Sequence, residues 1–158
     1  MGRVDSKIVV VTGAAGGQGA AEARALAAEG ATVIATDIQA PELEAPIIAR
    51  PLEVTSQAAW AELSGWLSER YGRVDGLVNN AGIALRARLA EITLAELERV
   101  MAINVSGPLL GIQTLSPLMA QGGSIVNVSS VAALLGYHAV GYTISKWAVG
   151  RGRRRGRG

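Results

Sequence analysis

A tyrosine and a lysine four residues apart, Tyr142 and Lys146, are the pair with the clearest chemical use in this chain of 158 residues. On a helix, residues i and i+4 share one face, so the lysine ammonium would lie near the phenol. A free tyrosine has a pKa of about 10, and a nearby positive charge favours the phenolate. Such a phenol can act as a general acid or base near neutral pH. Ordinary surface pairs have the same spacing, so the pair alone leaves both interpretations open.

A glycine-rich segment near the amino terminus has the composition of a phosphate-binding loop. Its sequence is Thr-Gly-Ala-Ala-Gly-Gly-Gln-Gly over residues 12–19, between an apolar run at 7–12 and an Ala-rich run at 18–29. Glycines let the backbone approach a pyrophosphate, and the helix that follows directs free N–H groups and its positive end toward the anion. The order of strand, glycine loop and helix predicts dinucleotide binding, and an ordinary glycine-rich turn is the alternative.

An acidic residue, Asp37, follows the next apolar run at residues 31–36 and lies 18 residues after Gly19. At such a position a carboxylate accepts hydrogen bonds from ribose hydroxyls and repels a 2′-phosphate. Ile38 and Gln39 come next, so no adjacent Arg or Lys is available to hold that phosphate. We therefore expect NAD as the cofactor and not NADP, with a solvated loop aspartate as the simpler alternative.

The segments that must position these residues alternate between apolar runs and helical patterns. Strands are expected at residues 7–12, 31–36, 74–79 and 124–128, and a further short strand is expected within residues 47–54. Helices are expected at 18–29, at 56–70, and from a Thr93-x-x-Glu96 capping box to about residue 119, with a break near 104–108. Because the strands are continuous apolar runs, the pattern predicts an α/β fold of the Rossmann type, a doubly wound parallel sheet with helices on both faces.

The composition is that of a globular protein and excludes several kinds of site. Hydrophobic residues make up 49% of the chain and charged residues 18%. There is no cysteine and a single histidine, His138, which we interpret as an exposed loop residue. Disulfides and metal sites are therefore not expected. We find neither a membrane-spanning run nor a signal-peptide pattern, so we expect a cytoplasmic protein.

Five features occur in an order that resembles the classical short-chain dehydrogenase/reductase family, over about residues 5–149. They are the glycine loop at 12–19, Asn-Asn-Ala-Gly at 79–82, Asn104, Ser-Ser at 129–130 and the Tyr142/Lys146 pair. The resemblance implies an NAD-dependent oxidoreductase that transfers hydride between NAD and a secondary alcohol or ketone. The sequence of residues 126–149 is similar to that of hydroxysteroid dehydrogenases. Family members are usually homo-oligomers.

The resemblance also implies roles for individual residues. Tyr142 would be the catalytic acid/base, and Lys146 would favour its ionised form and bind the nicotinamide ribose. Ser130 would hydrogen-bond the substrate oxygen, and Asn104 would support a water linked to Lys146 in a proton relay. Glu53 stands where the family usually has aspartate. The cofactor-binding residues implied are Gly13, Gly17, Gln18, Gly19, Asp37, Ile38, Glu53, Val54, Asn80, Ala81, Gly82, Tyr142 and Lys146.

The end of the chain departs from the family pattern. Five of the 15 basic residues lie in the last eight positions, and the first 150 residues therefore carry ten basic against 13 acidic side chains. We expect residues 1–149 to form one incomplete NAD-binding Rossmann domain and the Gly/Arg tail at 150–158 to be disordered. Family members run to roughly 250 residues, so the carboxyl-terminal strands of the family fold and part of its subunit interface would be lacking.

Three interpretations of function follow from these observations. The chain is an active oxidoreductase, or an inactive fragment of a truncated or frameshifted gene, or a binding protein whose arginine tail contacts nucleic acid or anionic surfaces. The tail has no aromatic residue for base stacking and the body is acidic, so no nucleic-acid partner is expected. Sequencing the gene beyond its stop codon tests the frameshift hypothesis, which requires family-like sequence in another frame.

Overall fold

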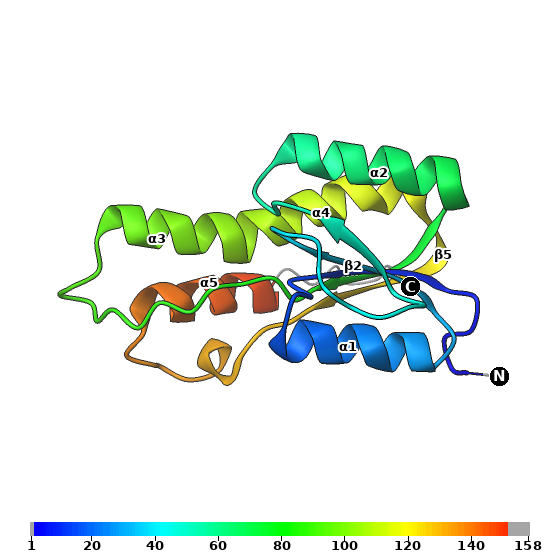
Figure 1. Ribbon diagram of the computed structural model, residues 1–158. Coiled ribbons are helices and arrows are strands. Elements are labelled where there is room, and N and C mark those ends of the chain that lie inside the picture. The colour runs from blue at the N-terminus through cyan, green and yellow to red at the C-terminus, as the bar shows by residue number, and fades with distance from the viewer. Residues whose placement is uncertain (1, 152–158) are drawn as a thin grey trace.

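The computed structural model describes residues 2–151, which form a single parallel sheet with helices on both faces (Figure 1). The strand order is β3-β2-β1-β4-β5. The strands are β1 (Ile8–Thr12), β2 (Thr32–Asp37), β3 (Ile48–Pro51), β4 (Val74–Asn79) and β5 (Met119–Asn127). The helices are α1 (Gly17–Ala28), α2 (Gln57–Tyr71), α3 (Leu94–Met101), α4 (Gly107–Leu115) and α5 (Val140–Arg151). This architecture confirms the predicted doubly wound fold.

The two faces of the sheet bury side chains of different size. Along β1, Ile8 and Val10 pack into the core beneath α2 and α4, whereas Val9 and Val11 pack into the core on the α1 side. The first core contains large side chains, among them the fully buried Trp60. The second core is largely alanine, so α1 lies close to the sheet and its amino end lies next to the end of β1.

Strand order places a pocket at one edge of the sheet. The chain runs outward from β1 through β2 to β3, and then crosses back to β4, which pairs with β1 on its other side. Between β1 and β4 the two loops at the carboxyl ends leave in opposite directions. In open α/β sheets this reversal creates the crevice where ligands bind.

The last predicted strand is longer than the sequence pattern indicated. We expected residues 124–128, but β5 covers Met119–Asn127, with an irregular register against β4 between Val74 and Gly76. Gly122 has a φ of 91°, a conformation that favours glycine. The strand therefore continues through Gly122, in the stretch where its pairing with β4 is irregular. The short strand expected within residues 47–54 is β3, Ile48–Pro51, and Pro51 ends it.

At the predicted break near residues 104–108 the helix does not stop, but one of its turns is wider than an α-helical turn. Residues Ala102–Ser106 form a π-helical turn that joins α3 to α4 without a loop. Pro108 has no N–H and its ring would crowd the carbonyl of Asn104 in an α-helix. A wider turn relieves that conflict, and π-turns are frequent at functional sites.

The boundary that we predicted for the tail lies two residues too early. Helix α5 includes Gly150 and Arg151. Val149 is buried, and this burial helps to offset the roughly 1 kcal/mol cost of glycine in a helix. The remainder of the predicted tail, residues 152–158, lies outside the described residues.

Candidate active site

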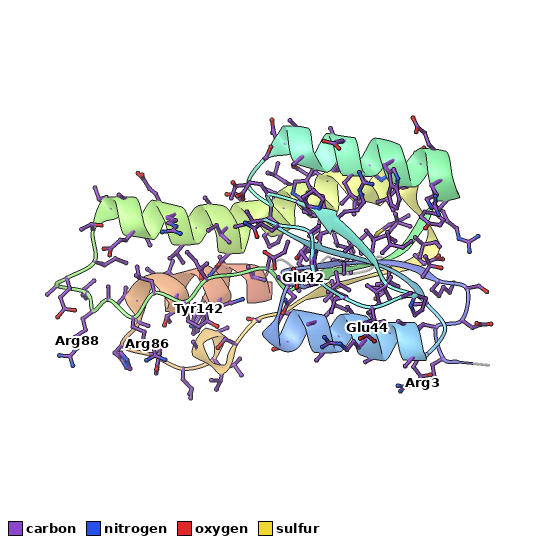
Figure 2. All side chains as sticks on the ribbon, in the orientation of Figure 1. Arg3, Glu42, Glu44, Arg86, Arg88 and Tyr142 are labelled. Carbon is purple, nitrogen blue, oxygen red and sulfur yellow. The ribbon has the colours of Figure 1, made fainter. Side chains whose placement is uncertain are left out.

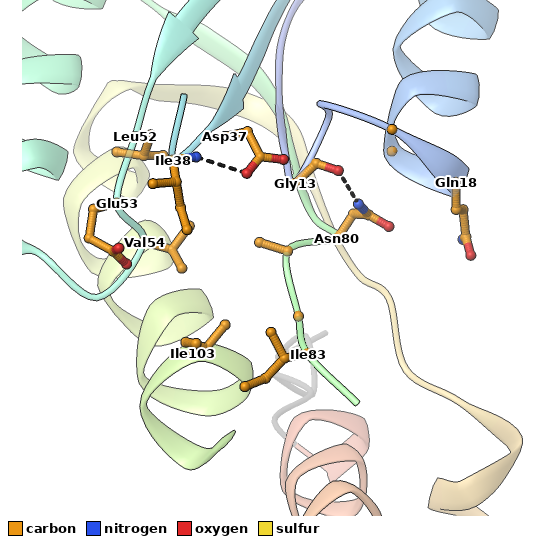
Figure 3. Close-up of a pocket in the computed structure, with 14 residues that line it drawn as sticks. Gly13, Gln18, Asp37, Ile38, Leu52, Glu53, Val54, Asn80, Ile83 and Ile103 are labelled. Carbon is orange, nitrogen blue, oxygen red and sulfur yellow. Dashed lines mark hydrogen bonds between the residues drawn. The ribbon is translucent and has the colours of Figure 1, made fainter. Parts of the chain in front are cut away.

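A pocket of about 390 Å³ opens at the carboxyl ends of β1, β2, β3 and β4 (Figure 3). Ten predicted cofactor-binding residues line it, namely Gly13, Gln18, Gly19, Asp37, Ile38, Glu53, Val54, Asn80, Ala81 and Gly82. Its other lining residues, which sequence reasoning missed, are Gly16, Leu52, Ile83 and Ile103. Each of these four is adjacent in sequence to a predicted site residue or lies within the glycine loop. Gly17 begins α1 and does not line the pocket.

The glycine loop follows the end of β1 closely because two of its positions have no room for a side chain. Gly13 has a φ of 68°, and a Cβ atom there would lie 2.7 Å from Ala81 Cα. A Cβ atom on Gly19 would collide with the carbonyl oxygen of Gly13. Around Gly16, by contrast, a Cβ atom would meet nothing within 4 Å. The loop is therefore packed on its sheet side and open on its pocket side.

The amino end of α1 is free to bind an anion. Gly16 is its N-cap residue, and no side chain caps the helix. The first N–H groups of a helix have no partner within the helix, and its dipole places partial positive charge there. A phosphate at this end would receive both the hydrogen bonds and the charge interaction that the helix leaves available.

Thr12 and Asn80 hold the glycine loop against the end of β4. Thr12 Oγ1 accepts hydrogen bonds from the backbone N–H groups of Asn80 and Ala81, at 3.1 and 3.0 Å. Asn80 Nδ2 donates to the carbonyl oxygens of Thr12 and Gly13, each at 3.0 Å, and Figure 3 draws the bond to Gly13. Asn80 is thus a positioning residue for the loop. The role of Thr12 was missed, although its place at the end of an apolar run was a usable signal.

Asp37 lies at the end of β2 and faces the pocket. Its carboxylate accepts hydrogen bonds from the N–H groups of Ala15 (3.0 Å) and Ile38 (2.8 Å; Figure 3). These bonds connect β2 to the glycine loop and fix the carboxylate beside the pocket. Glu53 is arranged differently, because its Oε1 accepts hydrogen bonds from the N–H and the hydroxyl of Thr55.

The far end of the pocket meets the buried lysine of α5. A Cβ atom on Gly82 would lie 3.5 Å from Lys146 Nζ, so the lysine is directly behind the pocket wall. Lys146 is 6% exposed, its Nζ donates to the carbonyl oxygen of Val128 at 2.8 Å, and it lies 5.7 Å from the centre of the Tyr142 ring. Burial lowers the pKa of Lys146 below its ordinary value. The predicted pair is thus brought together on one helix.

Asn104 in the π-turn connects three segments that are distant in sequence. Its Oδ1 accepts the N–H of Ile83 at 2.8 Å, and its Nδ2 donates to the carbonyl of Ile83 and to Ser145 Oγ at 3.0 and 2.9 Å. Ser145 Oγ in turn donates to the carbonyl oxygen of Tyr142 at 2.7 Å. Asn104 therefore fixes α5 relative to the pocket wall, and the sequence carried no signal for Ser145 as its partner.

The remaining predicted residues lie in the segment that leads into α5. Ser130 caps a short 3₁₀ turn, Val131–Ala133, through its Oγ, which accepts the N–H of Ala132 at 3.2 Å. Tyr142 is half-buried, and its phenol forms no hydrogen bond with any residue in the described range 2–151. His138 is exposed and packs against the Tyr137 ring, with centroids 4.1 Å apart.

A search of residues 2–151 found no group of three or more His, Asp or Glu side chains placed to hold a metal ion. In the same residues, no helix has both the length and the apolarity needed to cross a membrane.

A doubly wound sheet with a glycine loop at its switch point is the arrangement that binds dinucleotides in open α/β folds, and here a Tyr/Lys helix lies at the end of the pocket. A sequence model of the family described as short chain dehydrogenase matches residues 7–152. The chain belongs to the short-chain dehydrogenase family, whose members are oxidoreductases that use NAD(P).

Individual relatives agree with this assignment. Trans-4-hydroxycyclohexanecarboxylate dehydrogenase of Sinomonas cyclohexanicum is 37% identical, over 93% of this chain and 64% of its own length. The 3-alpha-(or 20-beta)-hydroxysteroid dehydrogenase of Mycobacterium tuberculosis is 38% identical, over 94% and 61%. The ligand-free aldohexose dehydrogenase of Thermoplasma acidophilum has a TM-score of 0.86 at 33% identity, over 92% of this chain and 58% of its own. The chain therefore spans less than two thirds of the length of these relatives.

The buried lysine makes the stability of the fold depend on pH. Because the pKa of Lys146 is lowered, the unfolded chain binds more protons than the folded chain at pH values between that pKa and 10.5. The free energy of unfolding therefore rises with pH across this window. Lys146→Met lacks the titrating group. The free energy of unfolding of the wild type minus that of the variant should therefore increase as pH rises. Urea denaturation of both proteins between about pH 7 and 10 measures this difference, and a constant difference would contradict the lowered pKa.

Proposed function

We propose that this chain binds NAD in the pocket of Figure 3 and transfers hydride between it and a secondary alcohol or ketone. The observation that carries the proposal is the pocket's far end, where the Lys146 ammonium lies behind Gly82 and next to Tyr142. A dinucleotide laid from Asp37 past the glycine loop to Gly82 would bring its second nucleoside to this pair. When bound, the nicotinamide ring supplies the hydride acceptor or donor.

The residues present fit such a cofactor. The open space beside Gly16 and the uncapped end of α1 suit a pyrophosphate. The Lys146 ammonium has three hydrogen-bond donors and Val128 uses one of them, which leaves two for the hydroxyls of a ribose. The carboxylate of Asp37, held by two backbone N–H groups, is placed for the other ribose.

Proton transfer in this mechanism belongs to Tyr142. During oxidation of an alcohol, its phenolate takes the hydroxyl proton, and during reduction of a ketone its phenol returns one. The buried Lys146 ammonium stabilises the ionised phenol. The Ser130 hydroxyl hydrogen remains available to donate to the substrate oxygen, because Ser130 Oγ only accepts its bond from Ala132. Asn104 holds α5, and therefore Tyr142, at the pocket.

We also propose that the alcohol is carried on a ring. Two of the relatives are named for a hydroxycyclohexanecarboxylate and a hydroxysteroid, which are cyclic secondary alcohols. The test is to incubate the chain with NAD and cyclohexanol and to follow NADH by its absorbance. Formation of NADH that requires both enzyme and alcohol supports the proposal. The absence of NADH with cyclohexanol and with a panel of further secondary alcohols would contradict it.

The preference for NAD is expected to depend on Asp37. Asp37→Ala should weaken NAD binding by about tenfold, because the ribose hydroxyls lose a charged acceptor, and Asp37→Ala with Ile38→Arg should in addition gain affinity for NADP. Calorimetric titration of wild type and both variants with NAD and NADP measures these affinities. An unchanged NAD/NADP ratio in the double variant would contradict the role of Asp37.

A further inference from the structure

The loop that follows Gly82 is fastened to α5 at both of its ends. At its start, Ile83 is bonded to Asn104, and through Asn104 to Ser145. At its other end, Ile92 packs on α5, since a Cβ atom on Gly141 would lie 2.8 Å from Ile92 Cδ1. Tyr142 lies between these two attachment points on the helix. The loop of residues 83–92 therefore passes alongside the part of α5 that carries Tyr142, and Figure 1 shows this loop running beside α5.

Two arginines on this loop, Arg86 and Arg88, have free guanidinium groups. Both side chains are exposed, and neither guanidinium forms an ion pair or a hydrogen bond with another residue of the range 2–151. Figure 2 shows Arg86 in the region of Tyr142 and Arg88 farther along the same loop. Glu91 is near Arg88, whose backbone N–H it accepts at 3.3 Å, so Arg86 is the less compensated charge.

A second segment that packs on α5 is apolar. The segment 131–139 packs against α5, to which it is also joined by a hydrogen bond from Thr143 Oγ1 to the carbonyl oxygen of Tyr137. Four large apolar side chains of this segment are 50–76% exposed, namely Val131, Leu134, Leu135 and Tyr137. Exposed apolar side chains gathered beside a site are a feature of ligand-binding surfaces.

We propose that the substrate of this site is a cyclic secondary alcohol that carries a carboxylate, and that Arg86 binds the carboxylate while the apolar segment 131–137 contacts the ring. The proposal rests on the function proposed above and specifies the substrate class of the same site. Guanidinium groups bind carboxylates through paired N–H donors, which gives both attraction and orientation. A neutral alcohol gains no such ion pair, so the arginine favours the acid.

Cyclohexanecarboxylate and the neutral cyclohexanecarboxamide are matched probes for this selectivity. We expect the 158-residue chain with NAD to bind the carboxylate about five- to tenfold more tightly than the amide, in a ligand-observed NMR titration. Arg86→Gln should remove most of this preference and leave amide binding unchanged, and added salt should reduce it in the wild type. Arg86→Lys, which retains charge without the planar fork, should keep part of the preference.

The control is Arg24→Gln on α1, which removes the same charge from a site beside Glu42 and Glu44, away from α5. It should leave the preference intact. Equal affinity for the two probes, no detectable binding of the carboxylate, or an unchanged preference in Arg86→Gln would each overturn the proposal. The binding measurement needs no turnover, so failure of the proposed hydride transfer, read from cyclohexanol oxidation, is distinguishable from failure of the carboxylate site.

Discussion

Replacing Tyr142 with phenylalanine is expected to lower kcat for alcohol oxidation by about 10²- to 10⁴-fold, the contribution typical of a positioned acid/base group. The substitution removes one oxygen from a half-buried side chain whose phenol bonds to no other described residue, so the fold should not change. NAD affinity should also be retained, because Tyr142 is not among the residues that line the pocket. Steady-state kinetics with cyclohexanol, together with calorimetric titration of NAD, separate these effects.

Tyr71→Phe is the matched control for this substitution. Tyr71 ends α2, and its hydroxyl accepts only a surface hydrogen bond from Arg70 at 3.1 Å. The same chemical change there should leave kcat within about twofold, since exposed hydrogen bonds contribute little. If Tyr142→Phe kept more than about a tenth of wild-type activity, another group would have to move the proton.

Replacing Gly19 with alanine is expected to remove NAD binding and to destabilise the fold by about 3 kcal/mol. The new methyl group would collide with the carbonyl oxygen of Gly13 and with the amide nitrogen of Asn80. The Asn80 amide cannot move away without losing its bonds to Thr12 and Gly13. Overpacking of this kind costs typically 1–3 kcal/mol, and a broken buried hydrogen bond adds about 1 kcal/mol. Urea denaturation and NAD titration measure the two consequences.

Gly65→Ala tests whether the effect arises from the position or from the loss of a glycine. Gly65 is exposed in the middle of α2, and a Cβ atom there would meet nothing within 4 Å. Alanine should therefore stabilise this helix by about 0.5–1 kcal/mol and leave NAD binding unchanged. If Gly19→Ala had the same stability and the same NAD affinity as Gly65→Ala, that result would contradict the close packing of the loop at Gly19.

The site shows where sequence patterns are informative. The run of β-branched residues before Gly13 predicted β1, and the glycines after it predicted a loop that the structure places at the pocket. The Tyr142/Lys146 spacing predicted one helical face, and the two side chains do lie 5.7 Å apart from ring centre to Nζ. In each case the pattern depends on residues within one or two turns of the chain, where backbone periodicity alone determines proximity.

Other parts of the site depend on contacts that no local pattern encodes. Ser145 meets Asn104 across 41 residues, and the Lys146 ammonium finds its acceptor at Val128, at the end of another element. β5 begins before the predicted residues 124–128, because its pairing with β4 reaches Met119 opposite Val74. The inclusion of Gly150 in α5 likewise accompanies the burial of its neighbour Val149.

The amino-acid sequence by itself determined the alternation of strands and helices, the glycine loop, the acid after β2 and the Tyr/Lys spacing, because these features arise from backbone periodicity over short distances. The tertiary structure alone decided which of them share a site. Strand order set β4 beside β1, which brought Asn80 to the glycine loop and Gly82 to Lys146. It also fastened the loop that carries Arg86 to α5, the helix of Tyr142, through the bonds that join Ile83, Asn104 and Ser145.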